Sequence, residues 1–204
     1  MKKIFLLFSL AAASFLGYWF FVKKKENKPT APPLQHLKLK KHSDKLNTSI
    51  DSVVNAYLSI KNAFVEADTT AAKANTLAFI ALLDRLPIEE LKKDTTSIFE
   101  TVQGNIADIK ANANSLLVQT DITEMRHDFS TMTEMLYPSF FTTINYEGQK
   151  LFVAKCPMAF SDSIAANWIS NSEEIVNPYL GKNHPTYHAG MLHCGEVVDS
   201  ILAK

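Results

Sequence analysis

Four stretches of the chain between residues 48 and 138 repeat apolar side chains at intervals of three and four residues. That spacing puts the apolar side chains on one face of an α-helix. The first stretch covers residues 48–65, the second is AAKANTLAFIALLDRL after Asp68, and the third begins near DTTSIFE. The fourth follows Asp121 and runs to Pro138. Four amphipathic helices with short connections predict a mainly α protein, built as a four-helix antiparallel bundle.

Each of these helices has an apolar face that we expect in the core. The faces are Ile50, Val53, Tyr57, Ile60 and Phe64 in the first helix, Ile98, Val102, Ile106, Ile109, Ala113 and Leu116 in the third, and Ile122, Met125, Phe129, Met132 and Leu136 in the fourth. Because Met125 and Met132 lie on such a face, we interpret them as core residues rather than metal ligands. Asp68 supplies a capping side chain for the second helix, and Pro87 ends it.

The last quarter of the chain, residues 151–204, has a different character. QKLFVAK is typical of a short strand, whereas SIAANWI and EVVDSIL are interpreted as short helical segments. Between them, VNPYLGKNHPTYHAG contains two prolines and two glycines and is expected to form turns. The sequence therefore predicts a short β-containing, turn-rich C-terminal segment on the helical-bundle domain of residues 48–204.

The N-terminus carries a separate signal. Nineteen residues without a charge, 4–22, lie between two lysine clusters. As a helix they would span about 28 Å, close to the hydrocarbon core of a bilayer. The small residues AAAS offer a signal-peptidase site, but cleavage there would leave an exposed apolar tail. We therefore predict that residues 1–22 form one apolar helix that anchors the protein in the membrane, with secretion to the periplasm as the alternative.

A basic, proline-containing linker is predicted over residues 23–47. Eight lysines face two acidic residues over 23–45, whereas residues 46–204 hold eleven basic and nineteen acidic side chains. The linker can meet anionic headgroups or simply be solvated. An acidic folded part lacks the clustered positive charge that nucleic-acid binding requires, so nucleic acid is not an expected partner.

Catalytic motifs are scarce in this chain. The six glycines form no phosphate-binding loop, and there is no GxSxG motif. Asp84, Glu89 and Glu90 lie beside Pro87, where carboxylates are typically solvated or capping. We therefore do not expect an enzyme.

Sulfur and imidazole side chains concentrate in the C-terminal segment. They are Cys156, Met158, His184, His188, Met191, His193 and Cys194. Thiolate and thioether ligands favour Cu(I) and related soft ions, and imidazole also binds copper and zinc. The first hypothesis is therefore a soft-metal site, with a copper ion as the expected cofactor.

A disulfide is the second hypothesis for the same residues. In an oxidising compartment the only two cysteines, Cys156 and Cys194, can bridge each other. Closing a loop of that length contributes about 3 to 4 kcal/mol in the chain-entropy model. Pro157 and Pro178 would then be turn residues and Trp168 a core anchor, and two free thiols remain a third possibility. The metal and disulfide hypotheses both require that Cys156 and Cys194 are neighbours in the fold.

The C-terminal motifs resemble a family of bacterial exported proteins that is classed as a domain of unknown function and also occurs fused to periplasmic adaptor subunits of heavy-metal efflux pumps. The resemblance rests on CPMA, on a tryptophan followed by a hydrophobic residue and serine, on I-x-NPY-x-G and on ML-x-CG. These positions are Cys156, Pro157, Met158, Ala159, Trp168, Ile169, Ser170, Ile175, Asn177, Pro178, Tyr179, Gly181, Met191, Leu192, Cys194 and Gly195. The helical part resembles the family more loosely, through VVNAYLSIKNAFVEAD and EMRHDFSTMTEML.

The resemblance implies an extracytoplasmic helical bundle with a metal-related role, on the periplasmic side of the inner membrane. Its implied partners are an efflux-pump adaptor or a metal donor or acceptor protein. We expect the soft ion to be held by two thiols and two thioethers, with one of two histidines as an additional ligand. The candidate ligands are Cys156, Met158, Met191 and Cys194, with His193 or His188. The segment KNHPTYHAG is longer than in members with a tight connection between NPYYG and ML.

Overall fold

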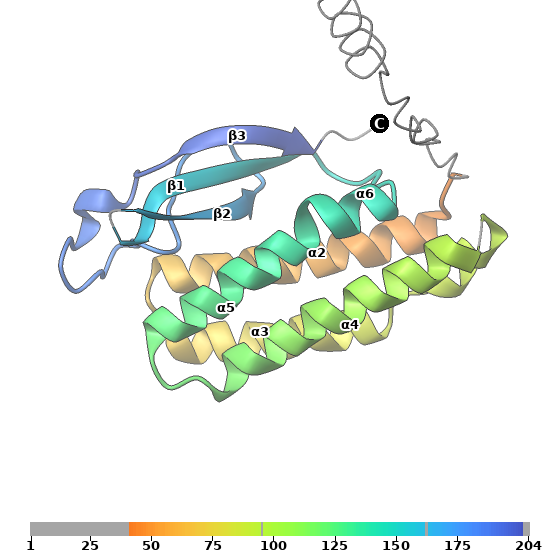
Figure 1. The fold of residues 1–204 in the computed structure, drawn as a ribbon, viewed down its shortest axis with the longest axis horizontal. Coiled ribbons are helices and arrows are strands. Elements are labelled where there is room, and N and C mark those ends of the chain that lie inside the picture. The colour runs from red at the N-terminus through yellow and green to blue at the C-terminus, as the bar shows by residue number, and fades with distance from the viewer. Residues whose placement is uncertain (1–40, 95, 162, 202–204) are drawn as a thin grey trace, which may run out of the picture. The chain divides into compact units, whose positions relative to one another are not determined.

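The computed structural model of the protein describes residues 41–94, 96–161 and 163–201 (Figure 1). This part is mainly helical and ends in a small antiparallel sheet, which confirms the predicted fold at that level. The predicted anchor, residues 1–22, lies outside the described residues. Within the described ranges, no helix has both the length and the apolar character needed to cross a membrane.

The first described helix, α2 (Asp44–Val65), begins earlier than the predicted Thr48. Ser43 caps it, because its Oγ accepts a hydrogen bond of 3.1 Å from the backbone N–H of Leu46. The helix then buries its whole predicted apolar face. His42, immediately before the cap, is also buried and hydrogen-bonds through Nε2 to the carbonyl of Ile144. The chain is therefore already packed against the rest of the fold at the first turn of α2.

The next two helices follow the sequence pattern closely. Asp68 caps α3 (Thr69–Asp84) by accepting from the backbone N–H of Ala71 at 2.8 Å, as predicted. A short 3₁₀ helix, η1 (Ile88–Lys93), follows Pro87. In α4 (Thr96–Val118), every residue of the predicted apolar face is buried.

The fourth predicted helix is interrupted before it reaches Pro138. α5 (Ile122–Glu134) begins after Asp121, as predicted, and the Asp121 carboxylate caps it by accepting from two backbone N–H groups. A π-helical turn, η2 (Met135–Phe140), and a short helix, α6 (Phe141–Thr143), then follow. Within η2, Tyr137 has extended backbone angles, φ −122° and ψ 131°. The ring of a proline disfavours helical angles in the preceding residue, which explains why the regular helix ends early.

The four long helices α2, α3, α4 and α5 pack in chain order, and each runs opposite to the one before it (Figure 1). Their apolar faces meet in one hydrophobic core that also includes residues of the sheet. Met125 and Met132 are fully buried in this core, as predicted.

The sheet has the strand order β2-β1-β3, with antiparallel neighbours. Its strands are β1 (Leu151–Ser161), β2 (Ile164–Ser170) and β3 (Glu196–Ile201). The helical interpretation of SIAANWI and EVVDSIL is therefore wrong. SIAANWI follows β1 after a very short connection and pairs back onto it as a hairpin, while the adjacent valines of EVVDSIL favour a strand.

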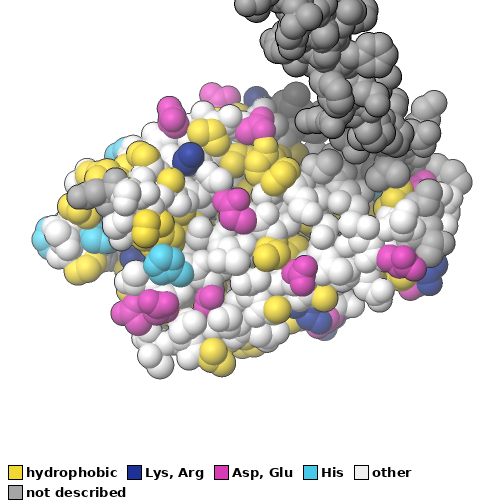
Figure 2. Space-filling view, viewed as in Figure 1, with side chains coloured by type: hydrophobic (Ala, Val, Ile, Leu, Met, Phe, Trp, Pro, Cys, Tyr) yellow, Lys and Arg dark blue, Asp and Glu magenta, His cyan; other side chains and the backbone are white. Residues whose placement is uncertain are grey.

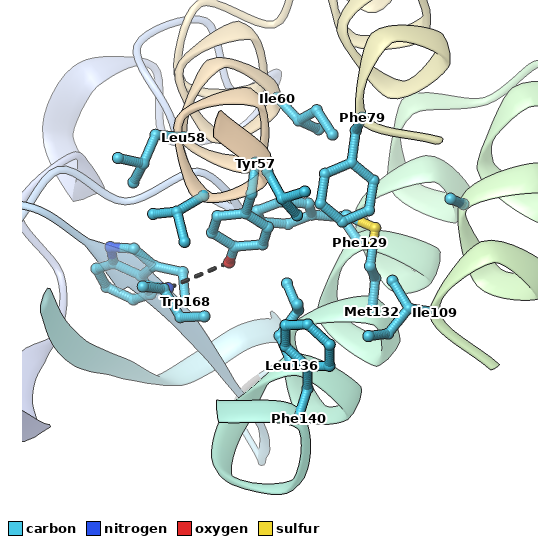
Figure 3. Packing of buried hydrophobic residues seen from close by; sticks show 14 of the residues in the cluster. Tyr57, Leu58, Ile60, Phe79, Ile109, Phe129, Met132, Leu136, Phe140 and Trp168 are labelled. Atoms are coloured by element: carbon cyan, nitrogen blue, oxygen red, sulfur yellow. Dashed lines mark hydrogen bonds between the residues drawn. The ribbon is translucent and has the colours of Figure 1, made fainter. Parts of the chain in front are cut away.

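Tyr57 of α2 connects the helices to the sheet (Figure 3). Its hydroxyl accepts from the backbone N–H of Ile169 in β2 at 3.1 Å and donates to Oγ1 of Thr133 in α5 at 2.7 Å. Thr133 can serve as the acceptor because its own hydroxyl donates to the carbonyl of Phe129 at 3.0 Å. The Tyr57 and Phe129 rings also stack, with centroids 5.0 Å apart. Burial raises the pKa of Tyr57, so the hydroxyl keeps the proton that this chain of hydrogen bonds requires.

Candidate functional site

Cys156 and Cys194 lie together, as both sequence hypotheses require. Their Sγ atoms are 3.0 Å apart, although the residues come from β1 and from the segment just before β3. The antiparallel pairing of β1 with β3 ends at Lys155 and Glu196, and it brings the two segments together, since Cys156 comes one residue after Lys155 and Cys194 two residues before Glu196. Cys156 is fully buried and Cys194 is half-buried.

Pro157 lies inside β1 rather than in a turn, so the prediction of a turn there is wrong. The β1–β3 pairing ends at Lys155, and the β1–β2 register is irregular between Cys156 and Ser161. A proline at this point therefore removes no N–H from a regular ladder. Met158 is two residues beyond Cys156, in the irregular part of β1. It is half-buried and packs against the hydrophobic core.

Met191 and Cys194 lie at the two ends of one turn. The backbone N–H of Cys194 donates to the carbonyl of Met191 at 3.0 Å, directly after the 3₁₀ helix η3 (Ala189–Met191). Met191 is half-buried and packs against the core, as Met158 does. All four predicted sulfur ligands therefore belong to the hydrophobic core or pack against it.

Gly195 allows Cys194 to approach β1. Its φ is +137°, in the left-handed region that favours glycine. A Cβ at this position would lie 2.8 Å from the carbonyl oxygen of Lys155 and 2.8 Å from the ring of Trp168. Trp168 itself is fully buried, as predicted for a core anchor. Any side chain at residue 195 would push the Cys194 segment away from Cys156.

The pKa of the Cys194 thiol is raised to about 11, chiefly by burial and then by its hydrogen-bonding contact with Cys156. The thiol is therefore protonated at neutral pH. An ion that binds the thiolate has to displace this proton, so binding is coupled to proton release.

His193 precedes Cys194 and has an exposed side chain. Its Nδ1 is 2.7 Å from the carbonyl oxygen of Ile175. A carbonyl can only accept, so Nδ1 carries the hydrogen and Nε2 of the neutral ring keeps its lone pair. Metal-binding histidines commonly have this arrangement, in which one ring nitrogen donates to a backbone carbonyl and the other is the ligand.

The longer segment with His184 and His188 forms a small turn of its own. The backbone N–H of His188 donates to the carbonyl of His184 at 2.9 Å. Nδ1 of His184 accepts from the backbone N–H groups of Thr186 and Tyr187, each at 3.2 Å. Burial, followed by the charge of Arg126, lowers the pKa of His184. Among the described residues, no hydrogen bond or ring contact joins His188 to either cysteine.

Histidine side chains gather at the end of the molecule formed by residues 171–195 (Figure 2). Of the six histidines in the sequence, three belong to this segment. Two of the three, His188 and His193, have exposed side chains. This end of the molecule therefore has imidazole groups in the same lobe as the cysteine pair.

Arg126 of α5 holds the NPYLG motif against the helices. Its side chain is buried, with Nε donating to the carbonyl of Pro178 at 3.0 Å and Nη2 to that of Phe64 at 2.9 Å. Burial lowers the pKa of Arg126 to about 10, which leaves the guanidinium charged at neutral pH. Next to it, the N–H of Lys182 donates to the carbonyl of Val65 at 2.8 Å. This contact is close enough that Gly181 has no room for a Cβ.

Arg126 has a structural role that the sequence analysis missed, although a signal was present. Position 126 follows Ile122 by four residues and precedes Phe129 by three, so it belongs to the apolar face of α5. A charged residue on a buried helical face indicates a specific partner. The partners themselves, two backbone carbonyls far away in the sequence, have no sequence signature.

Within the described ranges, no three side chains of the types His, Cys, Asp and Glu lie close enough to form a metal site by themselves. Methionine is not among these types. A site with more than two ligands at the cysteine pair therefore has to combine the two thiols with thioether sulfur or with an imidazole that moves.

Residues 53–146 match the model of a family described as "Protein of unknown function (DUF3347)". The matched region covers most of the helices, less than half of the chain, and ends before β1. It supports a relation to an uncharacterised domain family through the part that resembled the family more loosely. Fusion to efflux-pump adaptors is not part of the family's description, and the motifs CPMA, NPYxG and MLxCG lie outside the match. Neither the curated proteins nor the solved structures gave a match.

Proposed function

We propose that this protein binds a soft metal ion of the copper type outside the cytoplasm and that it serves heavy-metal efflux or homeostasis. The observation that carries the proposal is the contact of Cys156 and Cys194, 3.0 Å apart at Sγ in a segment rich in sulfur and imidazole. Two thiols on neighbouring strands form a ready pair of soft ligands.

The geometry of the pair is compatible with one bound ion after a small movement. With metal–sulfur bonds of about 2.3 Å and a tetrahedral angle, two thiolates lie about 3.8 Å apart, so the sulfurs have to separate by about 0.8 Å. Cys194 is the half-buried partner and lies at the end of a turn, so it is the cysteine better able to move. The residues present therefore suit a soft ion.

Further ligands are available beside the thiols. Met158 lies two residues from Cys156 in β1, and Met191 shares a turn with Cys194. Nε2 of His193 keeps a lone pair, because Nδ1 donates to Ile175. We assign the thioethers as the next ligands, with His193 or His188 as an addition.

The proposed setting follows from the sequence. Residues 4–22 would hold the protein in the inner membrane with the folded part on the periplasmic side, and the basic linker would separate the two. In that position the domain can receive an ion from, or pass it to, a donor or acceptor protein such as an efflux-pump adaptor. This role is binding and transfer of the ion, without a catalytic residue.

The test is titration of the reduced full-length protein in detergent with Cu(I), against a competing chelator of known affinity. We expect the double variant Cys156→Ser and Cys194→Ser to lose at least a hundredfold in affinity. Met158→Leu and Met191→Leu should each weaken binding, whereas Met132→Leu, a matched change in the helical core, should not. Unchanged affinity in a correctly folded double variant would rule out the proposal.

The pH dependence provides an independent check. Below the Cys194 pKa of about 11, each thiol proton that the ion displaces should strengthen binding about tenfold per pH unit. Affinity should therefore rise steadily between pH 6 and pH 9. A flat profile would contradict ligation by Cys194.

A disulfide is the second candidate, favoured by the same short separation of the sulfurs. The bond forms when an oxidant, such as the disulfide of another envelope protein, takes two electrons from the thiols and two protons are released. It would link β1 to the segment just before β3. Mass spectrometry of protein from the cell envelope distinguishes the two, since a two-proton mass deficit that reductant restores indicates the disulfide, and intact thiols with a retained ion indicate the metal site.

A further inference from the structure

Asn177 joins two segments of the C-terminal lobe from a fully buried position. Its backbone N–H donates to the carbonyl of Leu192 at 2.8 Å, and its side-chain Nδ2 donates to the carbonyl of Cys194 at 2.8 Å. Its side-chain Oδ1 accepts from the backbone N–H groups of Tyr179 and Leu180, at 2.8 and 3.0 Å. A single side chain therefore shapes its own turn and also holds the residue that carries a candidate thiol.

We propose that Asn177 is a positioning residue for Cys194, and this inference rests on the metal-binding function proposed above. The amide fixes the backbone of Cys194 directly, through a bond to its own carbonyl. Its opposite end is fixed in turn, because Oδ1 is held by two N–H groups of a turn that Arg126 ties to α5. The helices therefore position Cys194 through two successive hydrogen bonds, from Arg126 to the carbonyl of Pro178 and from Asn177 to the carbonyl of Cys194.

The two ends of the amide have different tasks. Oδ1 stabilises the turn at residues 177–180, as the short polar side chains of Asn, Asp and Ser commonly do. Nδ2 alone reaches the Cys194 carbonyl, and neither Asp nor Ser can donate over that distance in the same geometry. The positioning role therefore belongs to the amide nitrogen, and a substitution can remove it while part of the turn chemistry remains.

The substitution that separates these tasks is Asn177→Ser. Its hydroxyl can still accept from the N–H of Tyr179, as serine does in comparable turns, but it is too short to reach Cys194 and it adds no charge. We expect Cu(I) affinity of the full-length protein to fall by 10- to 100-fold, the usual loss when a group that orients a ligand is removed. Affinity within twofold of the unsubstituted protein would overturn the proposal.

A second readout follows Cys194 itself and needs no metal. In the reduced protein the Cys194 thiol has a pKa of about 11 and should react slowly with iodoacetamide at pH 8. Releasing the residue in Asn177→Ser should increase the rate more than tenfold and shift the pH profile of the reaction to lower pH. An unchanged profile contradicts the proposal even if the lobe is destabilised.

The matched control is Tyr179→Phe. It removes a buried hydroxyl that bonds to the carbonyl of Asn167 in the same lobe, without touching Cys194. This variant should lose comparable stability and retain the Cys194 pH profile. If both variants change the profile equally, general loosening of the lobe explains the effect and the proposal fails.

A measurement on the unsubstituted protein covers the case in which Asn177→Ser does not fold. The side-chain ¹⁵N amide signals of Asn177 should be protected from solvent exchange and should shift when Cu(I) is added. Fast exchange, or no shift while Cu(I) binds, would contradict the proposal. If the unsubstituted protein does not bind Cu(I) at all, the metal-binding function fails, and the iodoacetamide profile still decides whether Asn177 positions Cys194.

Discussion

The helical part, residues 44–143, and the C-terminal lobe, residues 151–201, are held together in different ways. The helices share one hydrophobic core, to which each apolar face contributes several side chains. The sheet of the lobe contributes buried residues to the same core, but the segment after β2 is also held by a few contacts with backbone groups, made by Arg126, Asn177, Gly181 and Gly195. A shared core distributes a change over many neighbours, whereas a single contact with a backbone carbonyl has no substitute.

The family match lies in the helical part, whereas the candidate metal-binding residues lie in the lobe. The match covers residues 53–146, whereas both cysteines lie beyond it in the lobe. The helices therefore supply the frame, and the lobe contains the residues proposed as ligands. Four substitutions test this difference.

The largest effect is expected for Gly181→Ala in the lobe. The added Cβ would overlap the carbonyl group of Val65, with its carbonyl carbon only 2.9 Å away, and would displace the bond from Lys182 to that carbonyl. We expect a loss of about 3 kcal/mol in unfolding free energy, or roughly 6 to 12 °C in Tm. Chemical denaturation followed by circular dichroism measures this loss. A loss below 1 kcal/mol would show that the lobe accommodates the added methyl group by shifting its neighbours, as a shared core does.

Tyr57→Phe tests the junction between the two regions. The change leaves the buried N–H of Ile169 without its acceptor and removes the donor to Thr133. We expect a loss of about 2 kcal/mol, which is the cost of a buried unsatisfied polar group. Hydrogen exchange should also show faster opening of β2 than of α4. If hydrogen exchange accelerates equally in β2 and α4, the contacts of Tyr57 do not separate the stability of the lobe from that of the helices.

Gly104→Ala is the matched counterpart of Gly181→Ala in the helical part. Gly104 lies inside α4, and a Cβ there would meet nothing within 4 Å. The same added methyl group should therefore increase stability by about 1 kcal/mol, because alanine is the better helix former. A thermal melt should show a higher Tm, and a decrease would contradict the contrast between the regions.

The smallest effect is expected for Tyr137→Phe, which removes a surface contact between η2 and β3. The Tyr137 hydroxyl donates to Asp199 and is the first cause of the lowered pKa of that carboxyl group. A lowered carboxyl pKa stabilises the fold above the unfolded value of about 4, and the contribution disappears as pH falls through the folded pKa. Solvent screening limits it to a few tenths of a kcal/mol. Urea denaturation should therefore show a slightly lower unfolding free energy for Tyr137→Phe than for the unsubstituted protein at pH 7, and no difference below pH 3.

Much of the helical part could be predicted from the sequence, because a buried helical face repeats at fixed spacing. The cap Asp68, the start of α5 after Asp121 and the apolar face of α4 were predicted correctly. The end of α5 was not, since the effect of Pro138 on Tyr137 was overlooked. SIAANWI was also misassigned, because seven residues with two adjacent alanines show neither alternation nor a helical period.

The candidate site was predictable only in its residue types and in one contact. With two cysteines in the chain, any joint role requires that they meet, and they do. The residues that bring them together were not assigned a role. Asn177, Gly195 and Arg126 act through backbone groups that lie far away in the sequence, and backbone groups are the same in every residue.

The unequal burial of the two cysteines imposes an order of events on the pair. Cys156 is covered completely, while Cys194 is open to solvent on one side. A protein that delivers the proposed ion can reach Cys194 first. A protein that removes the ion has to replace Cys194 as a ligand before Cys156 dissociates from it. The same sequence holds for an attacking thiolate. In the proposed exchange, the more exposed sulfur of Cys194 is therefore the atom that an incoming or outgoing partner contacts.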